Sequence, residues 1–133
     1  MIRPKVCFAA MGVIRDAETG SISAFNIFEG IRASGVPVFL QTLSFFVSWE
    51  RDLADAPNYE GTFTATIAGQ QLMTNGVTLT FGDKTRHRTI INVNGLVVPT
   101  VGALTFALGL ANGVRAEYAM DIEGPPAIAQ VQH

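Results

Sequence analysis

Apolar and polar residues alternate at every second position along much of this chain, and this pattern constrains its fold more than any other feature. The clearest case is residues 104–110, LTFALGL, with residues 114–122, VRAEYAMDI. A period of two is that of a β-strand, whereas an amphipathic helix repeats every 3.6 residues. Asn112–Gly113, between the two segments, is the favoured pair of a type I′ turn. We therefore predict a β-hairpin here, closed by a type I′ turn.

Six further segments are alternating or continuously apolar between turn signals, which is typical of strands. They lie at 6–14, 20–31, 39–51, 62–68, 77–81 and 86–94. No segment has the 3.6-residue apolar period of a helix. Each strand has one face to bury, and two sheets packed face to face bury it economically. We predict an all-β fold: a two-sheet antiparallel β-sandwich of about eight strands, of the immunoglobulin-like, C2-like or jelly-roll type.

The length of the chain and the positions of its prolines predict the domain organisation. The 133 residues fit one domain, and no composition shift or internal repeat marks a boundary. We predict a single β-sandwich domain over residues 1–124. Residues 125–133, PPAIAQVQH, open with two prolines and leave no room for a useful helix, so we predict an extended C-terminal tail that could contact a neighbouring chain.

The chain carries few charges for a small domain. Charged residues make up 15% of the sequence, against roughly 25% in typical soluble domains, and the mean hydropathy is +0.30. Because a small domain has a large surface for its volume, either uncharged polar residues cover that surface or another chain covers part of it. The second alternative favours a homo-oligomer, or binding to another protein. The net charge of −2 supplies no global basic field, so we expect no nucleic-acid partner.

Residues 6–14 are apolar and follow a basic start, as the core of a signal peptide does. The segment runs into Ile14-Arg15-Asp16 without a clear cleavage site, and it is too short to span a bilayer. We therefore expect a buried strand, no membrane partner, and a cytoplasmic location, or a virion location if a phage encodes the protein.

The sequence offers little for catalysis or for metal and cofactor binding. Its histidines and cysteine are Cys7, His87 and His133, and no pair of them has metal-ligand spacing. There is no Gly-x-Ser-x-Gly elbow, and no glycine-rich loop leads into a helix. A lone cysteine in an apolar run is typical of a small buried hydrophobe. We assign no catalytic, cofactor-binding or metal residue and expect no cofactor; enzymatic activity is unsupported but left open, since carboxylates from distant strands would escape detection.

The strongest charge feature is residues 83–89, DKTRHRT, in which Lys84, Arg86 and Arg88 share one face of a strand by parity. These three residues could contact an anion or a protein partner. Alternatively, they form a solvated strand face, or pair across a sheet with acids of the last strand. Those acids are Glu117, Asp121 and Glu123.

Trp49 and Tyr59 flank an acidic loop, and an exposed pair there could stack on a sugar or another ligand. Trp49 also continues the apolar parity of residues 39–49, FLQTLSFFVSW. The apolar residues at its odd positions are predicted to face the core; they are Phe39, Leu43, Phe45, Val47 and Trp49. That parity instead places Trp49 inside the protein.

The apolar face changes within residues 20–31, GSISAFNIFEGI. Ile22 and Ala24 share one parity, whereas Phe25 and Ile27 share the other. A β-bulge produces such a change, and so does a strand that crosses from one sheet to the other. We predict a bulge or sheet switch within residues 23–30, with the side chain of Asn26 bonding backbone groups left unpaired there.

Three segments resemble an uncharacterised family of small bacterial β-sandwich proteins, a domain of unknown function. They are GSISAFNIFEGI, VPVFLQTLSFFV (36–47) and the approach to the last hairpin with Val98, Pro99 and Gly102. The resemblance covers most of the chain, except for its Asn-Gly hairpin and its Pro-Pro tail. It implies a β-sandwich in a bacterial or phage setting, and it implies no site residue because the motifs are structural.

Together these features favour a non-enzymatic structural or protein-interaction module that self-associates. The alternative is a small-ligand or carbohydrate-binding β-sandwich module, because sandwiches commonly bind through their end loops.

Overall fold

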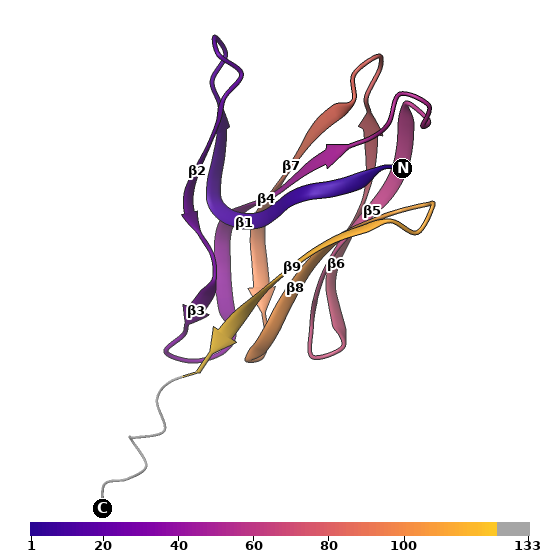
Figure 1. Cartoon of the computed structure of the whole chain (residues 1–133). Coiled ribbons are helices and arrows are strands. Elements are labelled where there is room, and N and C mark those ends of the chain that lie inside the picture. The colour runs from indigo at the N-terminus through magenta and orange to yellow at the C-terminus, as the bar shows by residue number, and fades with distance from the viewer. Residues whose placement is uncertain (125–133) are drawn as a thin grey trace, which may run out of the picture.

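The computed structural model of the chain describes residues 1–124, which form nine strands in two packed sheets (Figure 1). The strands are β1 (Arg3–Arg15), β2 (Ile22–Ile27), β3 (Gly30–Arg32), β4 (Val38–Glu50), β5 (Asn58–Ile67), β6 (Gln70–Thr80), β7 (Arg86–Val98), β8 (Gly102–Leu110) and β9 (Arg115–Glu123). One sheet has the order β2-β1-β4-β7, and the other has the order β3-β9-β8-β5-β6. The predicted all-β sandwich is confirmed. The predicted tail, residues 125–133, lies outside the described residues.

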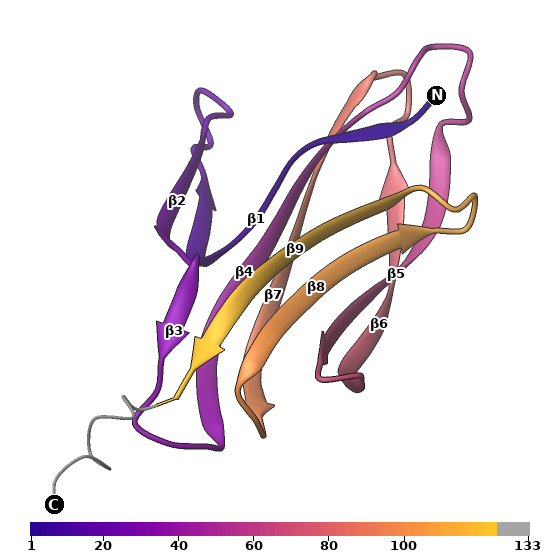
Figure 2. The ribbon, with the colours of Figure 1, turned by 60° about the horizontal axis from the view of Figure 1, so that its bottom comes forward.

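The strand pairs are antiparallel with one exception. The short strand β3 runs parallel to β9, with Ile31 opposite Ile122. The sheets are therefore antiparallel except at this edge. The reason is that the chain leaving β2 crosses to the other sheet without reversing, and so enters β3 in its original direction (Figure 2).

The two sheets meet in a core whose centre is aromatic. Phe45 of β4 lies 5.2 Å from Phe63 of β5 and 6.1 Å from Phe106 of β8, measured between ring centroids. Each of the three side chains is 0% exposed. Tilted aromatic pairs at such distances are favourable beyond the area that they bury. This cluster therefore joins the sheets at the positions that strand parity predicts.

Strand β4 turns its predicted face to the core from Leu43 to Trp49, but Phe39 is 62% exposed. Leu40 and Leu43 are both buried, so the alternation of side chains slips by one residue between them. The slip lies opposite Gly95 of β7, which has a φ of +79°. The prediction that Phe39 faces the core is therefore wrong. It assumed that side chains alternate regularly along the whole strand, but the alternation reverses between Leu40 and Leu43.

The predicted sheet switch within residues 23–30 is confirmed. Strand β2 pairs with β1, whereas β3 pairs with β9, and the chain crosses between sheets over residues 28–29. Asn26 just before the crossing has a φ of +50°, a conformation that asparagine adopts more readily than most residues. Its Nδ2 donates to Met11 Sδ at 3.6 Å, so the predicted bond to the backbone is wrong. The backbone finds its own partners instead: the Phe28 N–H donates to the Ala9 carbonyl at 2.8 Å.

The last hairpin is confirmed, but its turn is of another type. Asn112 lacks the positive φ that a type I′ turn requires, whereas Gly113 has a φ of +94°. The Gly113 N–H donates to the Leu110 carbonyl at 2.9 Å, which fits a three-residue loop ending in a left-handed glycine. The two-residue turn with two positive φ angles instead joins β5 to β6, at Ala68 (+50°) and Gly69 (+77°).

Strand β1 bends, and its far end forms an arm with β2, seen at the left of Figure 2. The strand pairs with β4 as far as Ala10, and beyond Ala10 it pairs only with β2. We call residues 11–27 the arm. Arg88 of β7 donates from Nη1 to the Gly20 carbonyl near the arm tip. The arm therefore stands over the outer face of the four-stranded sheet instead of continuing its plane.

A single buried arginine holds the connection between β4 and β5. Arg51 is only 4% exposed, and its Nε and Nη2 donate to the carbonyls of Lys84 at 2.9 Å and Gly82 at 3.0 Å. Its Nη1 donates to the Asp55 carbonyl at 3.1 Å within its own loop. The guanidinium carbon also lies 5.3 Å from the centroid of the Phe81 ring. Arg51 thus ties the β4–β5 and β6–β7 connections together, a role that its place beside an acidic loop does not reveal.

Candidate functional site

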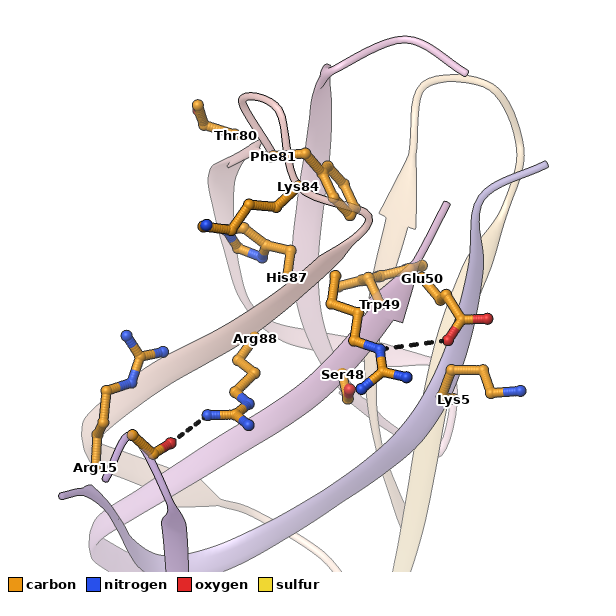
Figure 3. Close-up of a pocket in the computed structure, with 12 residues that line it drawn as sticks. Lys5, Arg15, Ser48, Trp49, Glu50, Thr80, Phe81, Lys84, His87 and Arg88 are labelled. Carbon is orange, nitrogen blue, oxygen red and sulfur yellow. Dashed lines mark hydrogen bonds and ion pairs between the residues drawn. The ribbon is translucent and has the colours of Figure 1, made fainter. Parts of the chain in front are cut away.

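A cationic pocket opens where the ends of β1, β4 and β7 meet the arm tip (Figure 3). The cavity measures about 720 Å³, within the range of about 300–1,000 Å³ that is usual for small-molecule sites. Five of the nine Lys and Arg residues of the chain line it. They are Lys5, Arg15, Lys84, Arg86 and Arg88. The chain as a whole is net negative, so this positive charge is a local concentration.

One acid, Glu50, lines the same pocket and is already engaged. Its Oε1 accepts from Arg3 Nη2 at 2.6 Å, and its Oε2 lies 3.7 Å from Arg86 Nε. The other four cations form no ion pair within residues 1–124. Gathered like charges repel one another, and a bound anion would relieve that repulsion.

His87 lines the pocket without adding to its charge. Its ring lies 5.5 Å from that of Phe81, and Nδ1 is 3.0 Å from Thr89 Oγ1. Burial, together with the positive charge of Arg15, lowers the pKa of His87 below its usual value. The imidazole is therefore neutral at pH 7, and the arginines and lysines supply the positive charge.

An apolar chamber of about 580 Å³ adjoins the cationic pocket. Its floor is the outer face of the sheet, where Phe8 and Phe46 stack at 5.1 Å between centroids. Its other wall is the arm. Residues of the arm that line it are Ser21, Ile22, Ala24 and Ile27. Ser48 and Arg88 line both cavities, so the pocket and the chamber form one cleft between the arm and the sheet.

The three basic residues expected at an anion or partner contact, Lys84, Arg86 and Arg88, do lie together in this cleft. The alternative pairing with acids of the last strand is wrong, because β7 and β9 belong to different sheets. Sequence reasoning missed Lys5 and Arg15, which lie roughly 70 to 80 residues before the others. Lys5 lies near them because β1 pairs with β4, the neighbour of β7, and Arg15 does so because the arm stands over the sheet. Whether these residues bind an anion stays a prediction.

The two aromatic residues proposed for ligand stacking lie in different environments. Trp49 is 0% exposed and has no ring face to offer a ligand, so the stacking prediction does not hold for it. Its alternative placement in the core is confirmed. Tyr59 is half-buried, with its ring 5.9 Å from Phe81 in an edge-on arrangement. Stacking by Tyr59 stays a prediction.

Within residues 1–124, no group of three His, Cys, Asp or Glu side chains is placed to hold a metal ion. Nor does any helix of this part of the chain have the length and apolarity that a membrane crossing requires. Cys7 is a thiol on β1 whose pKa is raised to about 12, first by burial and second by the negative charge of Glu117. A thiol in that state is a poor nucleophile at neutral pH.

At pH 8, we expect the rate at which iodoacetamide alkylates Cys7 to be about a thousand times lower in the folded protein than in the chain unfolded by urea. An ordinary thiol with a pKa near 8.5 is substantially ionised at this pH, whereas one near 12 is ionised to about one part in ten thousand. Mass spectrometry of timed samples measures both rates. Equal rates in buffer and in urea would contradict the raised pKa.

The side of the arm that faces away from the cleft is apolar and exposed. We call Ile14 and Phe25 the arm face; they are 53% and 49% exposed, and the register of β1 with β2 places them on the side opposite Ile22 and Ala24. The ring of Phe25 lies over Gly12, where an added Cβ would be 3.4 Å from it. Strand β2 beside this face is an edge strand of its sheet, and its sequence, ISAFNI, contains no charged residue and no proline.

The fold and these surfaces define a class: an all-β sandwich with a cationic cleft and an uncharged edge strand. No family model, curated protein or solved structure matches the chain. The resemblance to a bacterial family of unknown function therefore stays a prediction.

Proposed function

We propose that this protein is a non-enzymatic interaction module that self-associates through its arm, in a bacterial or phage setting. One observation carries the proposal: the edge strand β2 has no charge or proline, and apolar side chains beside it are about half exposed. Soluble proteins usually protect edge strands with charges, proline or bulges, because unpaired backbone groups template pairing with another chain. A protected edge is thus expected of a monomer, and β2 lacks that protection.

The proposed arrangement is a two-fold dimer in which β2 pairs antiparallel with β2 of a second copy. Pairing of this kind is isologous, so the two arm faces lie side by side on one face of the joined sheet. It would join two four-stranded sheets into one continuous sheet and bring Phe25 into contact with side chains of the second copy's β2. It would also account for the low charge content of the chain.

Light scattering coupled to size-exclusion chromatography tests this proposal. We expect a species of twice the 14.2 kDa monomer mass at micromolar concentration, and a monomer for Phe25→Lys. The lysine places like charges opposite one another across the two-fold axis. Val101→Lys is the matched control, because Val101 is similarly exposed, at 45%, in the β7–β8 connection. It should leave the mass unchanged.

A monodisperse monomer for the wild-type chain would refute self-association. A wild-type dimer that Phe25→Lys leaves intact would place the interface elsewhere. Circular dichroism of each variant identifies loss of folding as a separate cause.

A second candidate function is the binding of a small ligand, and the cationic pocket favours it. Four of its cations lack an acid partner within residues 1–124, in a chain with eleven acids. A small anion would pair with them. Isothermal titration of the full chain with sodium sulfate tests this function: we expect heat of binding, and its absence would refute small-anion binding.

A further inference from the structure

The cationic pocket and the apolar chamber are two halves of one cleft with opposite chemistry. Arg88 and Ser48 belong to the lining of both. Arg88 donates from Nη1 to the Gly20 carbonyl, so its guanidinium lies between the arm tip and the sheet, as Figure 3 shows. An arginine has five N–H donors, and the others of Arg88 remain for a ligand. A charged group beside Arg88 would therefore lie at the entrance to the chamber.

Most residues that line the chamber are aliphatic or phenylalanine, and they come from two directions. Val6 and the stacked pair Phe8 and Phe46 line the sheet side, and Ile22 and Ile27 line the arm side. Val6 and Ile27 are 51% and 50% exposed, so this apolar surface is open to solvent. Burying such surface is favourable, and a small inorganic anion would leave it uncovered.

We infer that the cleft binds a free amphipathic anion, one molecule with a negatively charged head and an unbranched apolar tail, such as a medium-chain carboxylate. The head pairs with Arg88 and the neighbouring cations, and the tail fills the chamber between the arm and the sheet. The complementarity of charge at one end and of apolar surface at the other selects this ligand class. This inference rests on the second candidate function, small-ligand binding, and is independent of self-association.

Isothermal titration of the full chain with sodium sulfate, and with sodium acetate, octanoate, decanoate and dodecanoate below their micellar concentrations, tests the inference. Affinity should rise by about two- to fourfold for each methylene added between octanoate and dodecanoate, since each buried methylene contributes. Dodecylammonium has the same tail and the opposite charge, and it should bind at least tenfold more weakly than the carboxylate. Higher salt should weaken binding because it screens the head group.

Two variants separate the halves of the cleft. Arg88→Gln should weaken dodecanoate about tenfold, because it removes a charge-assisted bond while keeping a side chain of similar shape. Ile27→Asn should flatten the dependence on tail length and leave sulfate binding unchanged. The matched controls are Arg115→Gln, an exposed arginine of the other sheet, and Val101→Asn; neither should change any affinity.

The outcomes are distinguishable. Sulfate binding with no gain from the tail overturns the amphipathic ligand and leaves small-anion binding in place, whereas no binding of sulfate or carboxylates overturns both. Dodecanoate binding that neither variant alters is adsorption outside the cleft and also overturns the inference. Flotation with phosphatidylglycerol vesicles should leave the protein in the soluble fraction. Binding to the vesicles would point to a membrane surface and refute a free ligand.

Discussion

Replacing Arg51 with alanine should lower the free energy of unfolding by about 3–5 kcal/mol. The side chain is 4% exposed and donates to carbonyls of both the β4–β5 and β6–β7 connections. Its loss takes the donor away from the part-buried hydrogen bonds to the carbonyls of Lys84, Gly82 and Asp55, and it opens a cavity against the ring of Phe81. Urea denaturation followed by circular dichroism measures the change.

Two further variants sharpen this prediction. Arg51→Lys keeps the charge, but an ammonium cannot reproduce the planar fork that reaches Lys84 and Gly82 at once, so it should recover only a minor part of the loss. Arg115→Ala, at an arginine exposed on β9, should change stability by less than about 0.5 kcal/mol. If alanine at positions 51 and 115 lowered the free energy of unfolding by similar amounts, Arg51 would not stabilise the β4–β5 and β6–β7 connections as proposed.

Replacing Phe45 with alanine should cost about 3–5 kcal/mol, since it empties the centre of the core. Phe45 is the ring that contacts both Phe63 and Phe106 across the two sheets, and all three are 0% exposed. Phe39→Ala on the same strand is the control, because the Phe39 side chain is 62% exposed and should cost less than about 1 kcal/mol.

A double-mutant cycle of Phe45→Leu and Phe63→Leu isolates the aromatic contribution. We expect a coupling energy of about 0.5–1.5 kcal/mol for rings 5.2 Å apart. A coupling near zero would mean that only buried area matters at this contact. Equal costs at Phe39 and Phe45 would contradict the assignment of Phe45 to the centre of the core.

The predictions that held are those that depend on neighbouring residues. Alternation in residues 104–110 and 114–122 identified the last hairpin, because a strand imposes its period of two wherever one face is buried. The change of parity near Phe25 identified the sheet switch for the same reason. The error at Phe39 has the converse cause: one irregular step between Leu40 and Leu43 reverses the face of every residue before it.

Turn chemistry was less informative than strand parity. Asn112–Gly113 matches the preference for a type I′ turn, but that turn occurs at Ala68–Gly69. Turn preferences differ by small energies, and the register of the flanking strands can outweigh them. Asn26 illustrates the same limit, since its role is its positive φ and not the backbone bond that was predicted.

The sequence by itself determined the β class of the fold, most inward-facing residues and the place where the chain changes sheets, because each depends on side chains within a few residues of one another. Only the tertiary structure decided the cleft and the role of Arg51. Lys5 joins Arg86 and Arg88 because β1 lies next to β4, which pairs with β7, and Arg15 joins them because the arm folds over the sheet. Contacts between residues so distant in the chain depend on strand order and bending, which local periodicity does not encode.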